Sequence, residues 1–233
     1  MSSQLIIALD FKNKDIALNF VKKLSPHDCK LKVGFELFVA AGPDFVKYLV
    51  DLGYDVFLDL KFHDIPNTVA NACKSAAKLG VWMMNVHASG GDIMMKAAKQ
   101  ALIDNRSNAK LIAVTVLTSI DQTQLNMTNV HMTPEDQVNH LAQLTDMSGL
   151  DGIVCSAQEA KMLRQNLNHE SHDEFLLVTP GIRPLGSKKG DQHRVMTPSE
   201  AKNAGASYIV VGRPITQADE PLKIIEQINL DLQ

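Results

Sequence analysis

The sequence has little of several features that mark particular classes of protein. Aromatic residues make up 5% of its 233 residues, with a single Trp, so a stacking surface for the bases of a nucleic-acid polymer is not expected. Lys and Arg number 23 against 26 Asp and Glu, a formal net charge of -3, which argues against binding to nucleic acid or to a membrane surface. No apolar run reaches membrane-spanning length. The hydrophobic share of 45% instead predicts an ordinary globular protein.

Cysteine is also scarce. Cys29, Cys73 and Cys155 are odd in number and far apart, and none has a second Cys at C-x-x-C spacing. This pattern suits a reducing compartment and does not suit a disulfide framework. The first apolar run, residues 5–9, is too short for a signal peptide and lacks its basic start, so we expect a cytoplasmic protein.

What the chain does contain is one repeated pattern: a short β-branched run, a loop, and an amphipathic stretch. The runs that predict strands are 5–9, 30–34, 55–60, 82–87, 110–115, 152–155, 175–179 and 207–211. The stretches that predict helices are 15–24, 43–52, 67–79, 93–105, 134–148, 158–167, 198–204 and 221–230. Alternation of this kind implies parallel strands joined by right-handed crossovers.

Eight such units fit either a closed barrel or an open doubly wound sheet. The length is near that of a (β/α)8 TIM barrel, and no G-x-G-x-x-G motif follows the first strand, as a dinucleotide-binding sheet would require. No change of composition divides the chain. We therefore expect a single (β/α)8 barrel domain over residues 1–233, with its active site at the C-terminal mouth of the strands.

Two connections are long for a compact domain, residues 118–133 and 180–197. Long segments without secondary structure are usually lids or binding loops, and both follow strands whose ends lie at the mouth. A tolerated surface insertion is the alternative for each.

Charged residues at the strand ends are the most informative feature. Asp10 follows the first strand, Lys32 lies in the second, and Asp59 and Lys61 end the third. Because side chains alternate along a strand, the apolar neighbours of these residues face the helices, and the charges point into the barrel. Desolvated charges cost stability, so their convergence favours a catalytic site over a structural ion-pair network.

Two further segments suit a ligand at the mouth. Asp64 adds a carboxylate three residues past Lys61, and Pro66 stands where a helix can begin. Gly212 and Arg213 follow the eighth strand, where barrels often bind phosphate, and Arg183, Gln192 and Arg194 in the long loop could supply more donors.

With these motifs the chain resembles the orotidine 5′-phosphate decarboxylase family along its whole length. The segments that carry the resemblance are 8–10 (ALD), 31–34 (LKVG), 59–68 (DLKFHDIPNT), 116–119 (VLTS), 180–183 (PGIR) and 211–214 (VGRP). It implies decarboxylation of orotidine 5′-monophosphate to uridine 5′-monophosphate and CO2 in pyrimidine synthesis. It also implies a homodimer with no metal and no organic cofactor.

The resemblance further implies a role for each residue. Lys61 protonates C6 of the pyrimidine within a catalytic array of Lys32, Asp59, Lys61 and Asp64, and Asp64 and Thr68 reach into the partner's site. Asp10 and Lys32 hold ribose hydroxyls. The substrate-binding residues that it implies are Asp10, Lys32, Asp59, Leu60, Lys61, Phe62, His63, Asp64, Ile65, Pro66, Asn67, Thr68, Thr118, Ser119, Arg183, Gln192, Gly212 and Arg213.

Two other functions remain as alternatives. The first is a metal-dependent sugar-phosphate decarboxylase or aldolase of the same barrel superfamily, against which the segments 65–68 and 118–119 speak. The second is a non-catalytic barrel that binds a phosphorylated metabolite, which would have no use for Lys61 between two aspartates. His169 and His172 lie in a polar stretch that predicts an exposed loop rather than a metal site.

Overall fold

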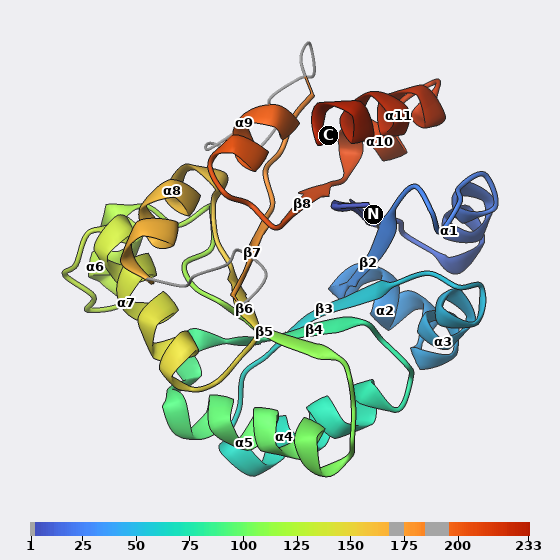
Figure 1. The fold of residues 1–233 in the computed structure, drawn as a ribbon. Helices are drawn as coiled ribbons and strands as arrows, with labels where there is room; N and C mark the ends of the chain where they lie inside the picture. Colours follow the sequence, from blue (N-terminus) through green and yellow to red (C-terminus); the bar gives the residue numbers. More distant parts are fainter. Residues whose placement is uncertain (1–2, 168–174, 185–195) are drawn as a thin grey trace.

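The structure, a computed structural model, describes residues 3–167, 175–184 and 196–233. Eight parallel strands form a closed barrel in sequence order, with β1 paired to β8. The strands are β1 Leu5–Ala8, β2 Lys30–Gly34, β3 Val56–Phe62, β4 Met83–His87, β5 Lys110–Val114, β6 Gly152–Val154, β7 Leu176–Thr179 and β8 Tyr208–Val211. Helices surround the barrel (Figure 1), which confirms the predicted TIM barrel.

The helices follow the predicted order with three additions. They are α1 Lys14–Val21, α2 Phe35–Ala41, α3 Pro43–Asp51, α4 Pro66–Ala77, α5 Asp92–Asp104, α6 Gln122–Met127, α7 Pro134–Met147, α8 Ala157–Asn166, α9 Pro198–Asn203, α10 Arg213–Thr216 and α11 Pro221–Asp231, with a 3-10 turn η1 at Ala88–Gly90. The expectation that residues 118–133 lack secondary structure was wrong, because α6 begins there at an Asp121 side-chain cap. The short helices α2 and α10 were also not predicted.

Alternation along the strands builds two hydrophobic layers. Odd-numbered residues of β1, such as Leu5 and Ile7, face the helices, while Ile6 and Ala8 belong to a separate cluster inside the barrel. Phe57 and Met83 join that inner cluster. The inner cluster fills the barrel with side chains, so a ligand can enter only at an end.

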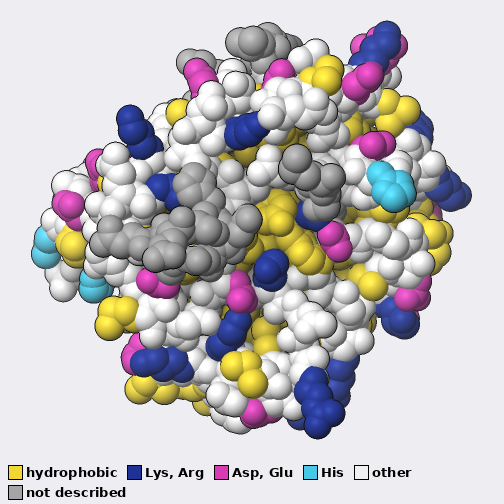
Figure 2. Space-filling view, in the orientation of Figure 1, with side chains coloured by type: hydrophobic (Ala, Val, Ile, Leu, Met, Phe, Trp, Pro, Cys, Tyr) yellow, Lys and Arg dark blue, Asp and Glu magenta, His cyan; other side chains and the backbone are white. Residues whose placement is uncertain are grey.

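The two ends of the chain meet beside β1 and β8. Ser3 Oγ donates a 2.9 Å hydrogen bond to Asn229 Oδ1 of α11, and the β1–β8 pairing aligns Leu5 with Ile209. On the face of the molecule seen in Figure 2, Lys and Arg side chains are interspersed with Asp and Glu around a hydrophobic centre. None of the helices in the described ranges has the length and apolar character needed to span a membrane.

Candidate active site

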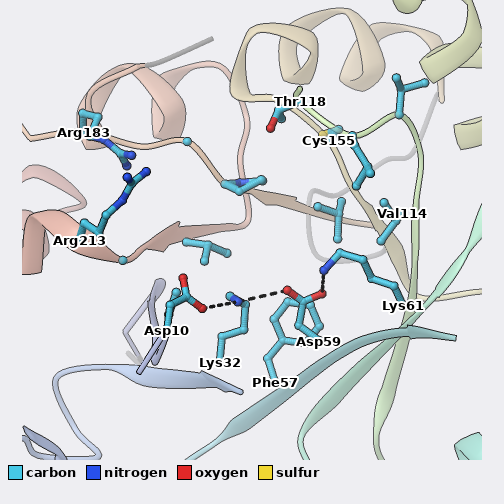
Figure 3. Close-up of a pocket in the computed structure, with 18 residues that line it drawn as sticks. Asp10, Lys32, Phe57, Asp59, Lys61, Val114, Thr118, Cys155, Arg183 and Arg213 are labelled. Atoms are coloured by element: carbon cyan, nitrogen blue, oxygen red, sulfur yellow. Dashed lines mark hydrogen bonds and ion pairs between the residues drawn. The ribbon is translucent and has the colours of Figure 1, made fainter. Parts of the chain in front are cut away.

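A pocket of about 250 Å³ lies at the C-terminal mouth of the barrel. Its lining residues come from six strands and from loops at the mouth, including the loop after β7: Ala8, Asp10, Lys32, Phe57, Asp59, Lys61, Val114, Val116, Leu117, Thr118, Val154, Cys155, Pro180, Gly181, Arg183, Val210, Gly212 and Arg213. Its floor is apolar and its walls carry charged groups on two sides (Figure 3).

One wall is a chain of alternating charges on three neighbouring strands. Lys32 Nζ lies 3.4 Å from Asp10 Oδ1 and 3.2 Å from Asp59 Oδ2. Lys61 Nζ donates a 2.6 Å hydrogen bond to the other oxygen of Asp59 (Figure 3). The side chains of Lys32 and Asp59 are each 12% exposed, and that of Lys61 is 22% exposed. The four charges therefore form one partly desolvated row.

The row keeps its inner members ionised. Burial alone would raise the pKa of Asp59, but the Lys32 and Lys61 ammonium groups, with hydrogen bonds from Lys61 and Asn85, outweigh it and lower that pKa. Burial alone would lower the pKa of Lys32, but Asp59 and Asp10 outweigh it and raise that pKa. Asp59 thus stays an anion and Lys32 a cation at neutral pH.

The opposite wall is basic. Arg183 and Arg213 point toward one another on the same side of the mouth (Figure 3), one following β7 and the other opening α10. Burial and the Arg213 charge both lower the pKa of Arg183. At Gly212, a Cβ would stand 3.5 Å from Asp10 Oδ2 and 3.4 Å from the Ala8 side chain, so the backbone runs close to the charged row. Two guanidinium groups turned to the same space suit a dianion.

The pocket gathers only part of the residues that the sequence suggested. Asp10, Lys32, Asp59, Lys61, Thr118, Arg183, Gly212 and Arg213 line it. Leu60, Phe62, His63, Asp64, Ile65, Pro66, Asn67, Thr68 and Ser119 do not. Gln192 and Arg194 lie outside the described residues, as do His169 and His172.

The predicted residues near the end of β3 and after it miss the pocket because they pack on the outer cluster or are at least partly exposed. Leu60 packs against the outer hydrophobic cluster, and Asp64 is exposed, where its Oδ1 accepts a 2.6 Å hydrogen bond from the Ile65 amide. Thr68 is an exposed residue in the first turn of α4. Ser119 lines a separate shallow hollow with Asp121 and Gln122.

Several lining residues were not selected from the sequence. Phe57, Val154 and Val210 form the apolar floor, and Pro180 and Gly181 form its edge after β7. The alternation that placed Asp59 inward also places Phe57 inward, and this signal could have found it. The role of Asn85, buried beneath the charged row, was missed as well.

A (β/α)8 barrel whose mouth sets a row of alternating Lys and Asp against two arginines defines a class of enzymes that act on phosphorylated small molecules. Residues 3–228 match the model of the orotidine 5′-phosphate decarboxylase / HUMPS family. The chain belongs to that family, which confirms the resemblance seen in the sequence.

Relatives match along the full chain. An orotidine 5′-phosphate decarboxylase of Pseudoalteromonas translucida is 58% identical over 233 residues, covering 100% of this chain and 98% of its own. One from Nitrosococcus oceani is 56% identical, covering 99% and 97%. The crystal structure of the Lactobacillus acidophilus orotidine 5′-phosphate decarboxylase superposes with a TM-score of 0.86 at 45% identity, covering 98% of each chain.

Proposed function

We propose that this chain decarboxylates orotidine 5′-monophosphate to uridine 5′-monophosphate and CO2, a step of pyrimidine synthesis, with residues 1–233 acting as one barrel domain. The observation that carries the proposal is the row Asp10–Lys32–Asp59–Lys61 at the mouth, in a chain 58% identical to a decarboxylase of that name. The opposed arginines suit the 5′-phosphate, and the apolar floor suits a pyrimidine ring.

Lys61 is the proton donor. Loss of CO2 breaks the bond between C6 and the carboxylate carbon and leaves the electron pair on C6, where the ring delocalises it poorly. An ammonium group beside C6 stabilises that pair and then gives it a proton, becoming an amine that water reprotonates. Lys61 is the lysine of the row that ends a strand at the mouth, and its 2.6 Å bond to Asp59 orients it there.

Asp59 acts on the substrate carboxylate. Its low pKa keeps it charged in the pocket, so a substrate carboxylate next to it meets repulsion that disappears when CO2 leaves. Asp10 and Lys32 hold ribose hydroxyls, with Thr118 and Ser119 near the ribose and base. Arg183, Gln192, Gly212 and Arg213 hold the phosphate, whose distance from C6 makes it a handle for orientation.

The enzyme acts as a homodimer in the cytoplasm. Asp64 and Thr68 are exposed in the protomer, as residues that enter a partner's site must be. Large hydrophobic side chains stand exposed just after three neighbouring strands at the mouth: Phe35 at 54%, Ile65 at 67% and Ile93 at 70%. A second copy would cover them. The three cysteines are free and buried, as suits a reducing compartment.

The deciding experiment adds orotidine 5′-monophosphate to purified protein treated with EDTA and follows the loss of its ultraviolet absorbance. Turnover that survives EDTA is expected. Turnover that needs a divalent metal would favour the sugar-phosphate alternative, and binding without turnover would favour a non-catalytic barrel.

Lys61→Ala tests the mechanism. We expect turnover to fall by more than about 10³-fold because the proton donor is lost, while binding of uridine 5′-monophosphate, measured by calorimetry, survives in part. Near-normal turnover would refute the assignment of Lys61.

The composite site has its own test. Asp64→Asn and Lys61→Ala chains, each inactive alone, should regain activity on mixing, because one site of the heterodimer keeps both native residues. Proven subunit exchange with no gain in activity would count against it.

A further inference from the structure

The pairing of β3 with β4 is irregular where the catalytic residues stand. Phe57 and Leu58 pair with Met83 and Met84, but the next pair is Phe62 with Val86. From Leu58 to Phe62, β3 advances four residues while β4 advances two, from Met84 to Val86. Two extra residues of β3 thus bulge at the mouth.

Lys61 stands in this bulge with a φ of +46°, a left-handed conformation that residues with a Cβ rarely adopt. Such a conformation persists only where surrounding contacts hold it. Its fixed backbone sets the point from which the ammonium group reaches the pocket.

The contact that holds the bulge comes from Asn85 in the middle of β4. Asn85 is fully buried, at 0% exposure. Its Oδ1 accepts a 2.8 Å hydrogen bond from the Lys61 amide, and its Nδ2 donates a 2.8 Å hydrogen bond to Asp59 Oδ1. The same Asp59 oxygen accepts the bond from Lys61 Nζ. One side-chain amide therefore closes a ring through the backbone of Lys61 and the carboxylate of Asp59.

We propose that Asn85 is a positioning residue of the decarboxylase: it fixes the bulged backbone of Lys61 and the orientation of Asp59 together, and so aims the Lys61 ammonium at C6. The proposal deepens, and rests on, the proposed role of Lys61. Only a group that both donates and accepts can make these two bonds. A merely apolar core residue would fill the space but leave the Asp59 oxygen and the Lys61 amide without this partner.

Asn85→Leu removes both hydrogen bonds and keeps the branched shape of the side chain. A displaced ammonium group lowers the rate of proton donation, and misplacement of a catalytic group by about 1 Å costs on the order of 10²-fold. We expect kcat to fall about 10²-fold while KM changes by less than about threefold, since Arg183 and Arg213 still hold the phosphate.

Asn85→Asp separates positioning from packing. At pH 8 its carboxylate still accepts from the Lys61 amide but repels Asp59, so kcat falls. Burial and the Asp59 charge raise the pKa of the new carboxyl group, while the Lys32 and Lys61 charges lower it. His87 and His63, whose rings lie side by side, are further titratable groups near this cluster. Once protonated, the carboxyl group donates to Asp59 and accepts from Lys61, as the native amide does. The ratio of the kcat of Asn85→Asp to the wild-type kcat at the same pH should therefore rise from pH 8 to pH 5. The same ratio for Asn85→Leu should not rise.

Thr145→Val is the matched control. Thr145 is also 0% exposed and loses its 2.7 Å hydrogen bond to the Leu141 carbonyl, but it lies in α7, away from the pocket. Its kcat should equal that of the wild type.

The outcomes are separable from the proposed function. An inactive wild type, or an active Lys61→Ala, would refute the proposed function or mechanism itself. If the wild type is active and Lys61→Ala is not, then wild-type kcat in a folded Asn85→Leu, or a flat pH ratio for Asn85→Asp, would overturn the role of Asn85. Failure of both Asn85 variants to fold, beside a folded control, would make Asn85 a residue of the core and overturn it as well.

Discussion

Two lysines of β2, two residues apart, show how differently the two ends of the barrel treat a buried charge. Lys30, 4% exposed at the N-terminal end, is ion-paired with Asp55 and lies 4.6 Å from the Trp82 ring and 5.7 Å from the Tyr208 ring. Lys32, two residues further along the strand and on the same face, lies between two carboxylates and borders the pocket.

The difference lies in what covers each ammonium group. The rings of Trp82 and Tyr208 meet edge to face, 5.0 Å apart, and pack on the inner hydrophobic cluster, so they close the bottom of the barrel over Lys30. Lys32 has carboxylates beside it and a cavity in front. A charge covered by rings serves the fold, while a charge left facing a cavity is available to a ligand.

The two lysines should therefore respond differently to the same substitution: Met in place of Lys should lower activity at position 32 and not at position 30. Lys32→Met should lower kcat/KM by about 10³-fold or more, because the Asp59 carboxylate loses a neighbouring cation and, in the proposed mechanism, so do the ribose hydroxyls. Lys30→Met should leave kcat/KM within about threefold of the wild type, because its side chain is remote from the mouth. Both are measured from the loss of substrate absorbance on folded protein. Equal losses in the two variants would erase the functional distinction between the ends.

Lys30→Met should lower stability rather than activity. Lys30→Met loses the cation–ring contacts and the pairing with the half-exposed Asp55, so we expect the free energy of unfolding to fall by about 1 to 3 kcal/mol. Urea unfolding of Lys30→Met, Asp55→Asn and the double variant gives the coupling energy of the pair. A coupling energy near zero would show that the rings, and not Asp55, hold Lys30.

The sequence predicted the barrel well because its signals are local. Each strand is a short, largely apolar run, and most helices carry an apolar face that repeats at helical spacing. The convergence of Asp10, Lys32 and Asp59 also followed from alternation. Whether a side chain points into the barrel depends on whether its place along the strand is odd or even.

What the sequence could not show depends on contacts between strands. The bulge at Lys61 exists because β3 carries two more residues than its partner, and alternation within one strand does not contain the register. Asn85 reads as one polar residue in an apolar run until its neighbours are known. Asp64 and Thr68 lie outside the pocket, and the place in a partner's site that we propose for them needs a second chain, which alternation within one chain does not describe.

The smallest expected effect is the pH dependence of the stability that Asp59 contributes at the mouth. The pKa of Asp59 is lowered in the folded protein, so its ionised form stabilises the fold above the unfolded pKa, and that contribution is lost as the pH falls through the folded pKa. Asn imitates the protonated acid. The unfolding free energy of Asp59→Asn should therefore lie below that of the wild type by a constant amount from pH 5 to pH 8, and the gap should narrow below about pH 4. Urea titrations at each pH measure it. If the wild type instead became more stable relative to Asp59→Asn as the pH falls, burial, which favours the neutral carboxyl group, would outweigh the effect of the Lys32 and Lys61 charges on the pKa of Asp59.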